Sequence, residues 1–157
     1  LDLIRPYEYL WNPRKSTALW HLLAIARTRH CRVVFTRWVR TKTYPDDALT
    51  ARGSHWTYQL PDKNSELLGG FYDDAVDEIV DVTSTNALQH LSLKPTQPVI
   101  LCGMWTESCV INTARAAVED NHAVYVYRSA CAGHFLIDWY ALWAIQALYA
   151  TVFAVST

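Results

Sequence analysis

The sequence lacks long apolar runs and a strong charge of either sign. Its apolar stretches are interrupted by Asp, Arg, Gln or His well before the roughly 18 residues that a membrane-spanning helix needs. The formal net charge at pH 7 is -1, which does not favour binding to nucleic acid or to an anionic membrane surface. We therefore expect neither a nucleic-acid partner nor a membrane partner, and the opening residues carry no signal-peptide pattern.

The cysteines and histidines show none of the spacings that predict a disulfide framework or a metal site. Of the four cysteines, Cys31, Cys102 and Cys131 lie in or beside apolar, strand-like runs, whereas Cys109 does not. The six histidines are scattered along the chain. We expect reduced thiols in a cytoplasmic protein, with no metal and no cofactor.

Length and composition favour a single globular domain. The chain has 157 residues, 51% of them hydrophobic, which is enough to build a full core. The most regular stretch, residues 98–132, predicts a buried strand at 99–102, a sharp turn through Gly103, a helix from about Ser108 and a second buried strand at 123–127. This order is typical of a βαβ unit and therefore of a parallel sheet.

The remaining pattern extends the βαβ unit into an α/β fold. Apolar runs predict further strands, and helical spacing predicts helices on either side of them. The helix at 134–147 is mostly apolar, so we expect it to be heavily buried. We predict a three-layer α/β/α sandwich with a mostly parallel central sheet. The other expected elements are a helix at 13–30, strands at 32–38, 77–82 and 150–155, and a short helix from Asn86.

Cys109 is the candidate nucleophile. It falls in the first turn of a predicted helix, just past the carboxyl end of a strand, which is where open α/β sheets bind their ligands. The positive end of the helix dipole lowers the pKa of a thiol there and favours the reactive thiolate. The alternative is that Cys109 is simply a small buried hydrophobic residue.

The motif around Cys109 resembles a known family. GMWTESCV at 103–110, followed by TARAA at 113–117, is similar to the G-x-x-T-x-x-C-V and T-A-R-x-A segments of the isochorismatase-like cysteine hydrolases, which include isochorismatases, nicotinamidases and related amidases. The resemblance extends more weakly over nearly the whole chain. It implies the Rossmann-like isochorismatase-like hydrolase fold for residues 1–157 as one domain, which we expect to be incomplete at both termini.

The resemblance also implies a set of catalytic roles. LDLIRPY at the start of the chain is similar to the family's I-D-x-Q-x-x-F segment, which makes Asp2 the base that activates Cys109, although Ile4 stands where glutamine is usual. The backbone N–H groups of Trp105 and Cys109 would hold the oxyanion, next to a cis peptide bond at Met104-Trp105. The alternative for Asp2 is a frayed, solvated terminal residue.

One family feature is missing. A lysine is expected at the end of the strand at 77–82, where this sequence has Asp81 or Val82 instead. An ammonium near a thiolate stabilises the negative charge, whereas a carboxylate does the reverse. Either Arg37 or Arg40 supplies the cation, or the hydrolytic activity is reduced or lost. In the second case the chain would be a catalytically impaired relative with a binding or oligomeric role.

The substrate pocket is predicted only in outline. The long region 39–66 is rich in Pro, Asp, Gly, Ser and Thr; it either covers the site or is an ordinary surface loop with one anchoring Trp. The resemblance makes Trp38, Trp56, Thr106 and Asn86 candidates to line the pocket. We expect a small amide, ureide or vinyl-ether substrate. The aromatic residues of this loop and of the last helix favour a homo-oligomer, either a dimer or a tetramer.

Overall fold

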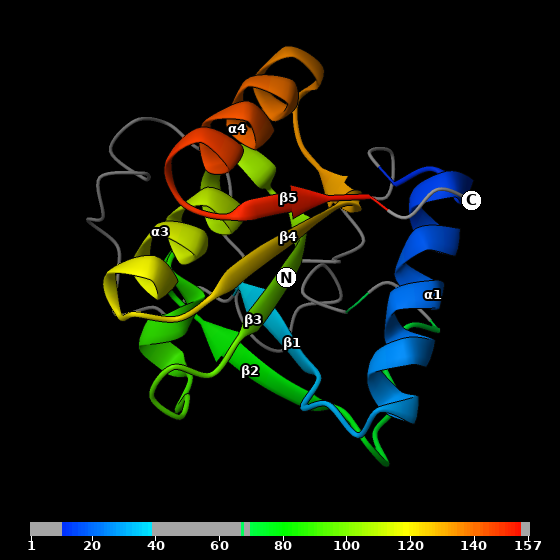
Figure 1. The fold of residues 1–157 in the computed structure, drawn as a ribbon. Helices are drawn as coiled ribbons and strands as arrows, with labels where there is room; N and C mark the ends of the chain where they lie inside the picture. The colour runs from blue at the N-terminus through cyan, green and yellow to red at the C-terminus, as the bar shows by residue number, and fades with distance from the viewer. Residues whose placement is uncertain (1–10, 39–66, 68–69, 155–157) are drawn as a thin grey trace.

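The computed structural model describes residues 11–38, 67 and 70–154, shown in colour in Figure 1. In chain order its elements are helix α1 (Pro13–Thr28), strands β1 (Val34–Trp38) and β2 (Glu78–Val82), the 3-10 turn η3 (Ala87–His90), strand β3 (Val99–Met104), the π-helical turn η4 (Thr106–Val110), helix α3 (Ile111–Glu119), strand β4 (Val124–Ala132), helix α4 (Phe135–Leu148) and strand β5 (Thr151–Phe153).

Helix α1 begins where the sequence predicts a helix. The side chain of Asn12 accepts a hydrogen bond from the backbone N–H of Lys15 at 3.0 Å, and Pro13 occupies the first helical position. Leu19 and Leu23 are buried against the sheet. The first turn of α1 therefore has a fixed position at one end of the sheet.

All strand pairings in the described part of the chain are parallel, in two pieces. β1 pairs with β2, and β3, β4 and β5 pair in that order. Figure 1 shows the two pieces following the same twist, with β1 and β3 as the strands that face each other. Because parallel strands leave all their carboxyl ends at one edge, both pieces direct their following turns to the same side.

Two apolar clusters define the layers. One packs α1 on one face of the strands and contains Leu19, Phe35 and Tyr127. The other packs α3 and α4 on the opposite face and contains Ala114 and Ile145. Figure 1 shows α1 on one side and α3 and α4 on the other. The predicted α/β/α sandwich is confirmed.

Strand β4 is longer than the sequence predicts. We expected the strand to end at 127, but β4 continues to Ala132. Leu101 pairs with Val126, whereas Gly103 pairs with Cys131, so the residues between bulge out before β4 pairs with β3 again. Gly103 has a φ of 115°, a conformation that a side chain disfavours.

Helix α4 corrects another expectation. We expected it to be heavily buried, but Leu136, Trp139 and Trp143 are 77%, 71% and 57% exposed. The prediction was wrong because α4 is in the outermost layer and packs with one side only, against η4, α3 and β5. Ala141 and Ile145 face inward on that side. An apolar helix therefore has one face that no described residue covers.

Candidate active site

Cys109 lies in the turn η4, directly after strand β3. Its side chain is only 7% exposed. The turn closes on the carbonyl oxygen of Trp105, which accepts hydrogen bonds from the N–H groups of Ser108 and Val110, both at 3.1 Å. The thiol is thus held at the carboxyl end of β3, where parallel sheets place ligands.

The residues before this turn have an unusual backbone. The peptide bond between Met104 and Trp105 is cis. The indole of Trp105 stacks on the imidazole of His134, with 4.6 Å between the ring centres and 21° between the planes. The turn that carries Cys109 is therefore in contact with the start of α4.

Glu107 makes the second link between η4 and α4. Its Oε1 accepts a hydrogen bond from the backbone N–H of His134 at 3.0 Å and lies 2.7 Å from His134 Nδ1. Its other oxygen, Oε2, is buried and has no hydrogen-bond partner among the described residues. A Cβ on Gly133 would lie 1.9 Å from this oxygen, so the carboxylate would have to move to admit a side chain there. No motif in the sequence marks this contact between Glu107 and His134.

The predicted pocket residues have different surroundings. Thr106 is fully buried in the same turn as Cys109, and its hydroxyl has no hydrogen-bond partner among the residues described. Asn86 caps η3, because its Oδ1 accepts from the N–H of Leu88 at 3.0 Å. The side chain of Trp38 and the whole of Trp56 lie outside the described residues, as does Asp2. The pocket role of the two tryptophans and the catalytic role of Asp2 stay predictions.

The expected lysine position carries an ion pair. Asp81 is directly opposite Arg37 in the register of β1 and β2. Arg37 donates to both carboxylate oxygens, from Nε at 2.7 Å and from Nη2 at 3.1 Å. The charge of Arg37, one of our two candidate cations, is therefore balanced by the carboxylate in the lysine's place. Arg40, the other candidate, lies outside the described residues.

Lys15 is a cation that the sequence did not reveal. From the first turn of α1, its ammonium donates a hydrogen bond to the carbonyl oxygen of Cys131, near the end of β4. This places a positive charge at the carboxyl edge of the sheet. No motif marks Lys15, because its position depends on how α1 crosses the sheet.

The strand interiors hold two further thiols. Burial raises the pKa of Cys102, in β3, and of Cys131, in β4. The Sγ of Cys131 also lies 3.4 Å from the carbonyl oxygen of Tyr127. Both positions favour the neutral thiol.

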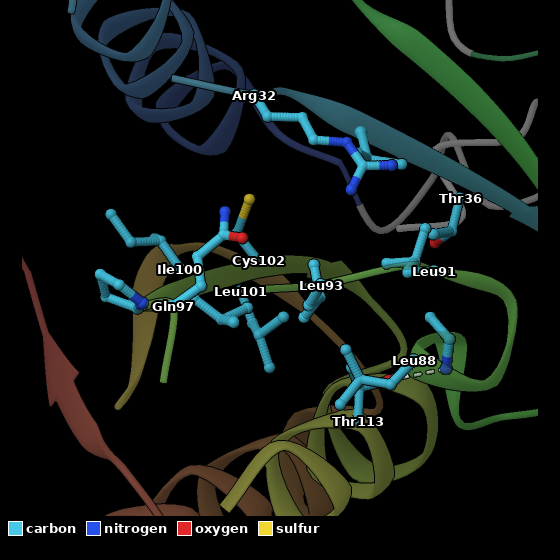
Figure 2. A pocket seen from close by; sticks show the side chains of 14 residues that line it. Arg32, Thr36, Leu88, Leu91, Leu93, Gln97, Ile100, Leu101, Cys102 and Thr113 are labelled. Atoms are coloured by element: carbon cyan, nitrogen blue, oxygen red, sulfur yellow. Dashed lines mark hydrogen bonds between the residues drawn. The ribbon is translucent and has the colours of Figure 1, made fainter. Parts of the chain in front are cut away.

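Between β1 and β3 the structure has open space, which we call the β1–β3 gap. A cavity of about 560 Å³ lies on the α1 side and one of about 160 Å³ on the α3 side. Val34, Ile100 and Cys102 line both. In Figure 2, Arg32 and Thr36 lie on one side of the space, and Leu101 and Cys102 on the other. In the described part of the chain, β1 pairs with β2 alone and β3 with β4 alone, so each has an unpaired edge toward the gap.

Two further features concern metals and membranes. No group of three or more His, Cys, Asp and Glu side chains in the described ranges is arranged to hold a metal ion. Over the same ranges, no helix has the length and apolar character needed to cross a bilayer.

The fold is a parallel α/β/α sandwich with a buried cysteine in the turn after a strand. A family model, the isochorismatase domain, matches residues 16–155, which is most of the sequence. The chain therefore belongs to the isochorismatase family, a family of hydrolases. No curated protein matches it.

Several solved structures share the fold. A pyrazinamidase/nicotinamidase from Streptococcus mutans is 19% identical, with a TM-score of 0.81, over 97% of this chain and 96% of that one. An N-carbamoylsarcosine amidase from Thermoplasma acidophilum is 21% identical, with a TM-score of 0.72, over 96% and 91%. A cysteine hydrolase from Pseudomonas syringae is 16% identical, with a TM-score of 0.78, over 98% and 85%. At these identities the similarity shows the fold alone.

Proposed function

We propose that this protein is a cysteine-dependent hydrolase of the isochorismatase-like type, acting on a small amide, ureide or vinyl-ether substrate. The observation that carries the proposal is the buried Cys109 in a closed turn directly after β3. The names of two similar structures, a nicotinamidase and a carbamoylsarcosine amidase, favour the amide and ureide classes.

For an amide or ureide, the reaction has two stages. Asp2 takes the proton of the Cys109 thiol, the sulfur bonds to the carbonyl carbon, and the backbone N–H groups of Trp105 and Cys109 stabilise the resulting oxyanion. The C–N bond then breaks, and Asp2 returns the proton to the leaving amine. Water hydrolyses the remaining intermediate, a thioester from an amide or a thiocarbamate from a ureide, and regenerates the thiol.

The β1–β3 gap supports the role of Asp2. Neighbouring strands lie about 4.8 Å apart, so a single extended segment between β1 and β3 would join the two pieces into one sheet. A segment parallel to both would end at the carboxyl edge, where the first turn of α1 lies with its Lys15–Cys131 contact. Residues 5–12 connect residues 1–4 to the start of α1. In the gap, residues 1–4 would bring Asp2 to the edge that carries Cys109.

Lys15 is our candidate for the missing cation. Its contact with the Cys131 carbonyl places it at the carboxyl edge. Arg37 is less suitable, because Asp81 balances its charge. An ammonium at this edge would favour both the thiolate and the oxyanion.

The test is a substrate screen of wild type and Cys109→Ala. Nicotinamide, short aliphatic amides, ureides and isochorismate cover the proposed classes. We expect turnover of at least one substrate by wild type and a loss of roughly 10³-fold or more in Cys109→Ala, because the covalent route disappears. Cys31→Ala, at an exposed cysteine, is the matched control and should keep full activity. Equal rates for Cys109→Ala and wild type would refute the proposal.

A second candidate function is supported by the Arg37–Asp81 pair. If the family lysine is indispensable, the chain would be an impaired relative with a binding or oligomeric role. Asp81→Lys then restores a cation at that position, and Asp81→Asn is its control for removing the carboxylate. A chain that gains turnover only in Asp81→Lys fits this second candidate, whereas wild-type turnover favours the first.

A further inference from the structure

Helix α4 presents an apolar stripe to the outside. Leu136, Tyr140, Trp143 and Ala147 recur at spacings of four, three and four, which places them along one side of a helix. All four are exposed, and Trp139 flanks them at 71% exposure. The opposite side of the helix packs on the core. We call these five residues the α4 face.

The α4 face is large for the surface of a monomer. A tryptophan side chain offers roughly 250 Å², and Trp139 and Trp143 are 71% and 57% exposed, so these two alone leave roughly 300 Å² uncovered. With Leu136 and Tyr140, and with Ile137 and Leu148 beside the α4 face, the exposed apolar area of the helix comes to roughly 700 Å². Each partner in a stable complex contributes about 800 Å². The patch thus has nearly the area that one side of a dimer interface needs.

The chemistry of the face favours an apolar, uncharged partner. α4 contains one charged residue, Asp138, whose Oδ1 is buried. It contains no Lys or Arg, the residues with which membrane-surface helices bind anionic lipid. Nor does it offer an acidic or basic partner a complementary charge. A second copy of the same face meets this requirement.

We propose that the α4 face binds the α4 face of a second copy, with the two helices antiparallel about a twofold axis near Tyr140 and Trp143. A twofold interface uses the same patch on both subunits. In this arrangement Leu136 packs on the partner's Ala147, so a large residue meets a small one at each end. At the centre, the rings of Tyr140 and Trp143 already lie 5.9 Å apart with 32° between their planes. The proposal does not depend on the hydrolytic function.

Sedimentation velocity of the full chain tests the interface. We expect wild type to sediment as a dimer at micromolar concentration, and Trp143→Glu to weaken dimerisation at least 100-fold, because its charge would be buried against the partner. Val76→Glu is the matched control, since Val76 is 61% exposed outside α4, and it should remain a dimer. The circular dichroism spectrum of each variant checks that it is folded.

Disulfide cross-linking tests the antiparallel geometry. The double variant Leu136→Cys/Ala147→Cys should form covalent dimers on mild oxidation, because the cysteine at position 136 of one subunit faces the cysteine at position 147 of the other. Wild type, with its exposed Cys31, is the background control. A cross-linking yield no higher than that of wild type would contradict the antiparallel arrangement.

Two other results would overturn the proposal. One is a wild-type monomer at all concentrations, together with binding to phosphatidylcholine vesicles that Trp143→Glu abolishes; this would assign the face to a membrane surface. The other is a dimer that Trp143→Glu leaves intact, which would place the interface elsewhere on the molecule.

Discussion

The turn after β3 holds the buried Cys109, and the strands hold the buried Cys131 and the half-buried Cys102, yet the two regions offer a thiol different surroundings. Cys102 and Cys131 lie within strands, where burial raises their pKa and favours the neutral thiol. Cys109 lies in a closed helical turn at the carboxyl edge, which His134 and Glu107 anchor to α4. Burial alone therefore does not identify a reactive cysteine. Under the function proposed above, the position of Cys109 at the sheet edge is what distinguishes it from the two strand cysteines.

We expect the largest effect on the reactivity of Cys109 from disturbing the contacts between Glu107 and His134, which hold η4 against α4. In Gly133→Ala, the added Cβ would meet Glu107 Oε2 at 1.9 Å and displace a buried carboxylate from His134. We expect a loss of about 2–3 kcal/mol in stability and roughly 100-fold slower alkylation of Cys109 by iodoacetamide. Urea unfolding measures the stability, and mass spectrometry measures the alkylation rate. Glu107→Ala removes the clash, so the double variant should lose less than the sum of the single variants; strict additivity would show that Gly133 acts by another route.

Glu107→Gln keeps the shape of the side chain but removes the negative charge that accepts from His134. The amide oxygen of Gln can still accept, so only the extra strength of a hydrogen bond to a charged group is lost, and we expect a loss of about 1 kcal/mol in the free energy of unfolding. Glu119→Gln is the matched control. It breaks an exposed pair with Arg115 and should cost less than about 0.5 kcal/mol. Equal losses in the two variants would mean that the link to His134 adds nothing specific.

Lys15→Met tests the cation at the carboxyl edge. It keeps most of the aliphatic length of the side chain and removes the charge that is held near Cys131. We expect the alkylation rate of Cys109 to fall about tenfold, because the thiolate is the reacting form and a nearby positive charge favours it. Lys94→Met, at an exposed lysine before β3, should leave the rate unchanged. The same rate in both variants would exclude Lys15 as the replacement cation.

The raised pKa values of Cys102 and Cys131 predict a loss of stability at alkaline pH. The native state holds these protons more tightly than the unfolded chain, so stability is fully present below the ordinary thiol pKa, about 8.5, and falls as the pH rises above it. The slope is at most about 1.4 kcal/mol per pH unit for each thiol. Urea unfolding of wild type and Cys131→Ala between neutral and alkaline pH measures it. A slope unchanged in Cys131→Ala would contradict the assignment.

Local pattern was sufficient to predict most of the fold. The βαβ unit around Gly103 and the alternation of helices with apolar strands predicted the parallel sheet and its layers, because burial on both faces produces continuous apolar runs. The extension of β4 to Ala132 was not predictable in this way. It depends on a bulge whose pairing with β3 spans residues far apart in the sequence.

Within the candidate site, the sequence predicted only the residues that belong to a recognisable motif. The motif located Cys109 and the turn before it, but the contacts of Glu107 with His134 and of Lys15 with Cys131 cross between elements that leave no joint pattern. The exposed side of α4 was missed for a related reason. Apolar composition indicates that a surface is to be buried, but not whether this chain or another one buries it.

Competitive alkylation of the native protein by iodoacetamide between pH 6 and 7, with each thiol followed by mass spectrometry, tests the central claim most directly. The account predicts that Cys109, although 7% exposed, reacts at least about tenfold faster than the exposed Cys31, and that Cys102 and Cys131 stay unmodified. A rate for Cys109 below that of Cys31, and equal to those of the two strand cysteines, would contradict it.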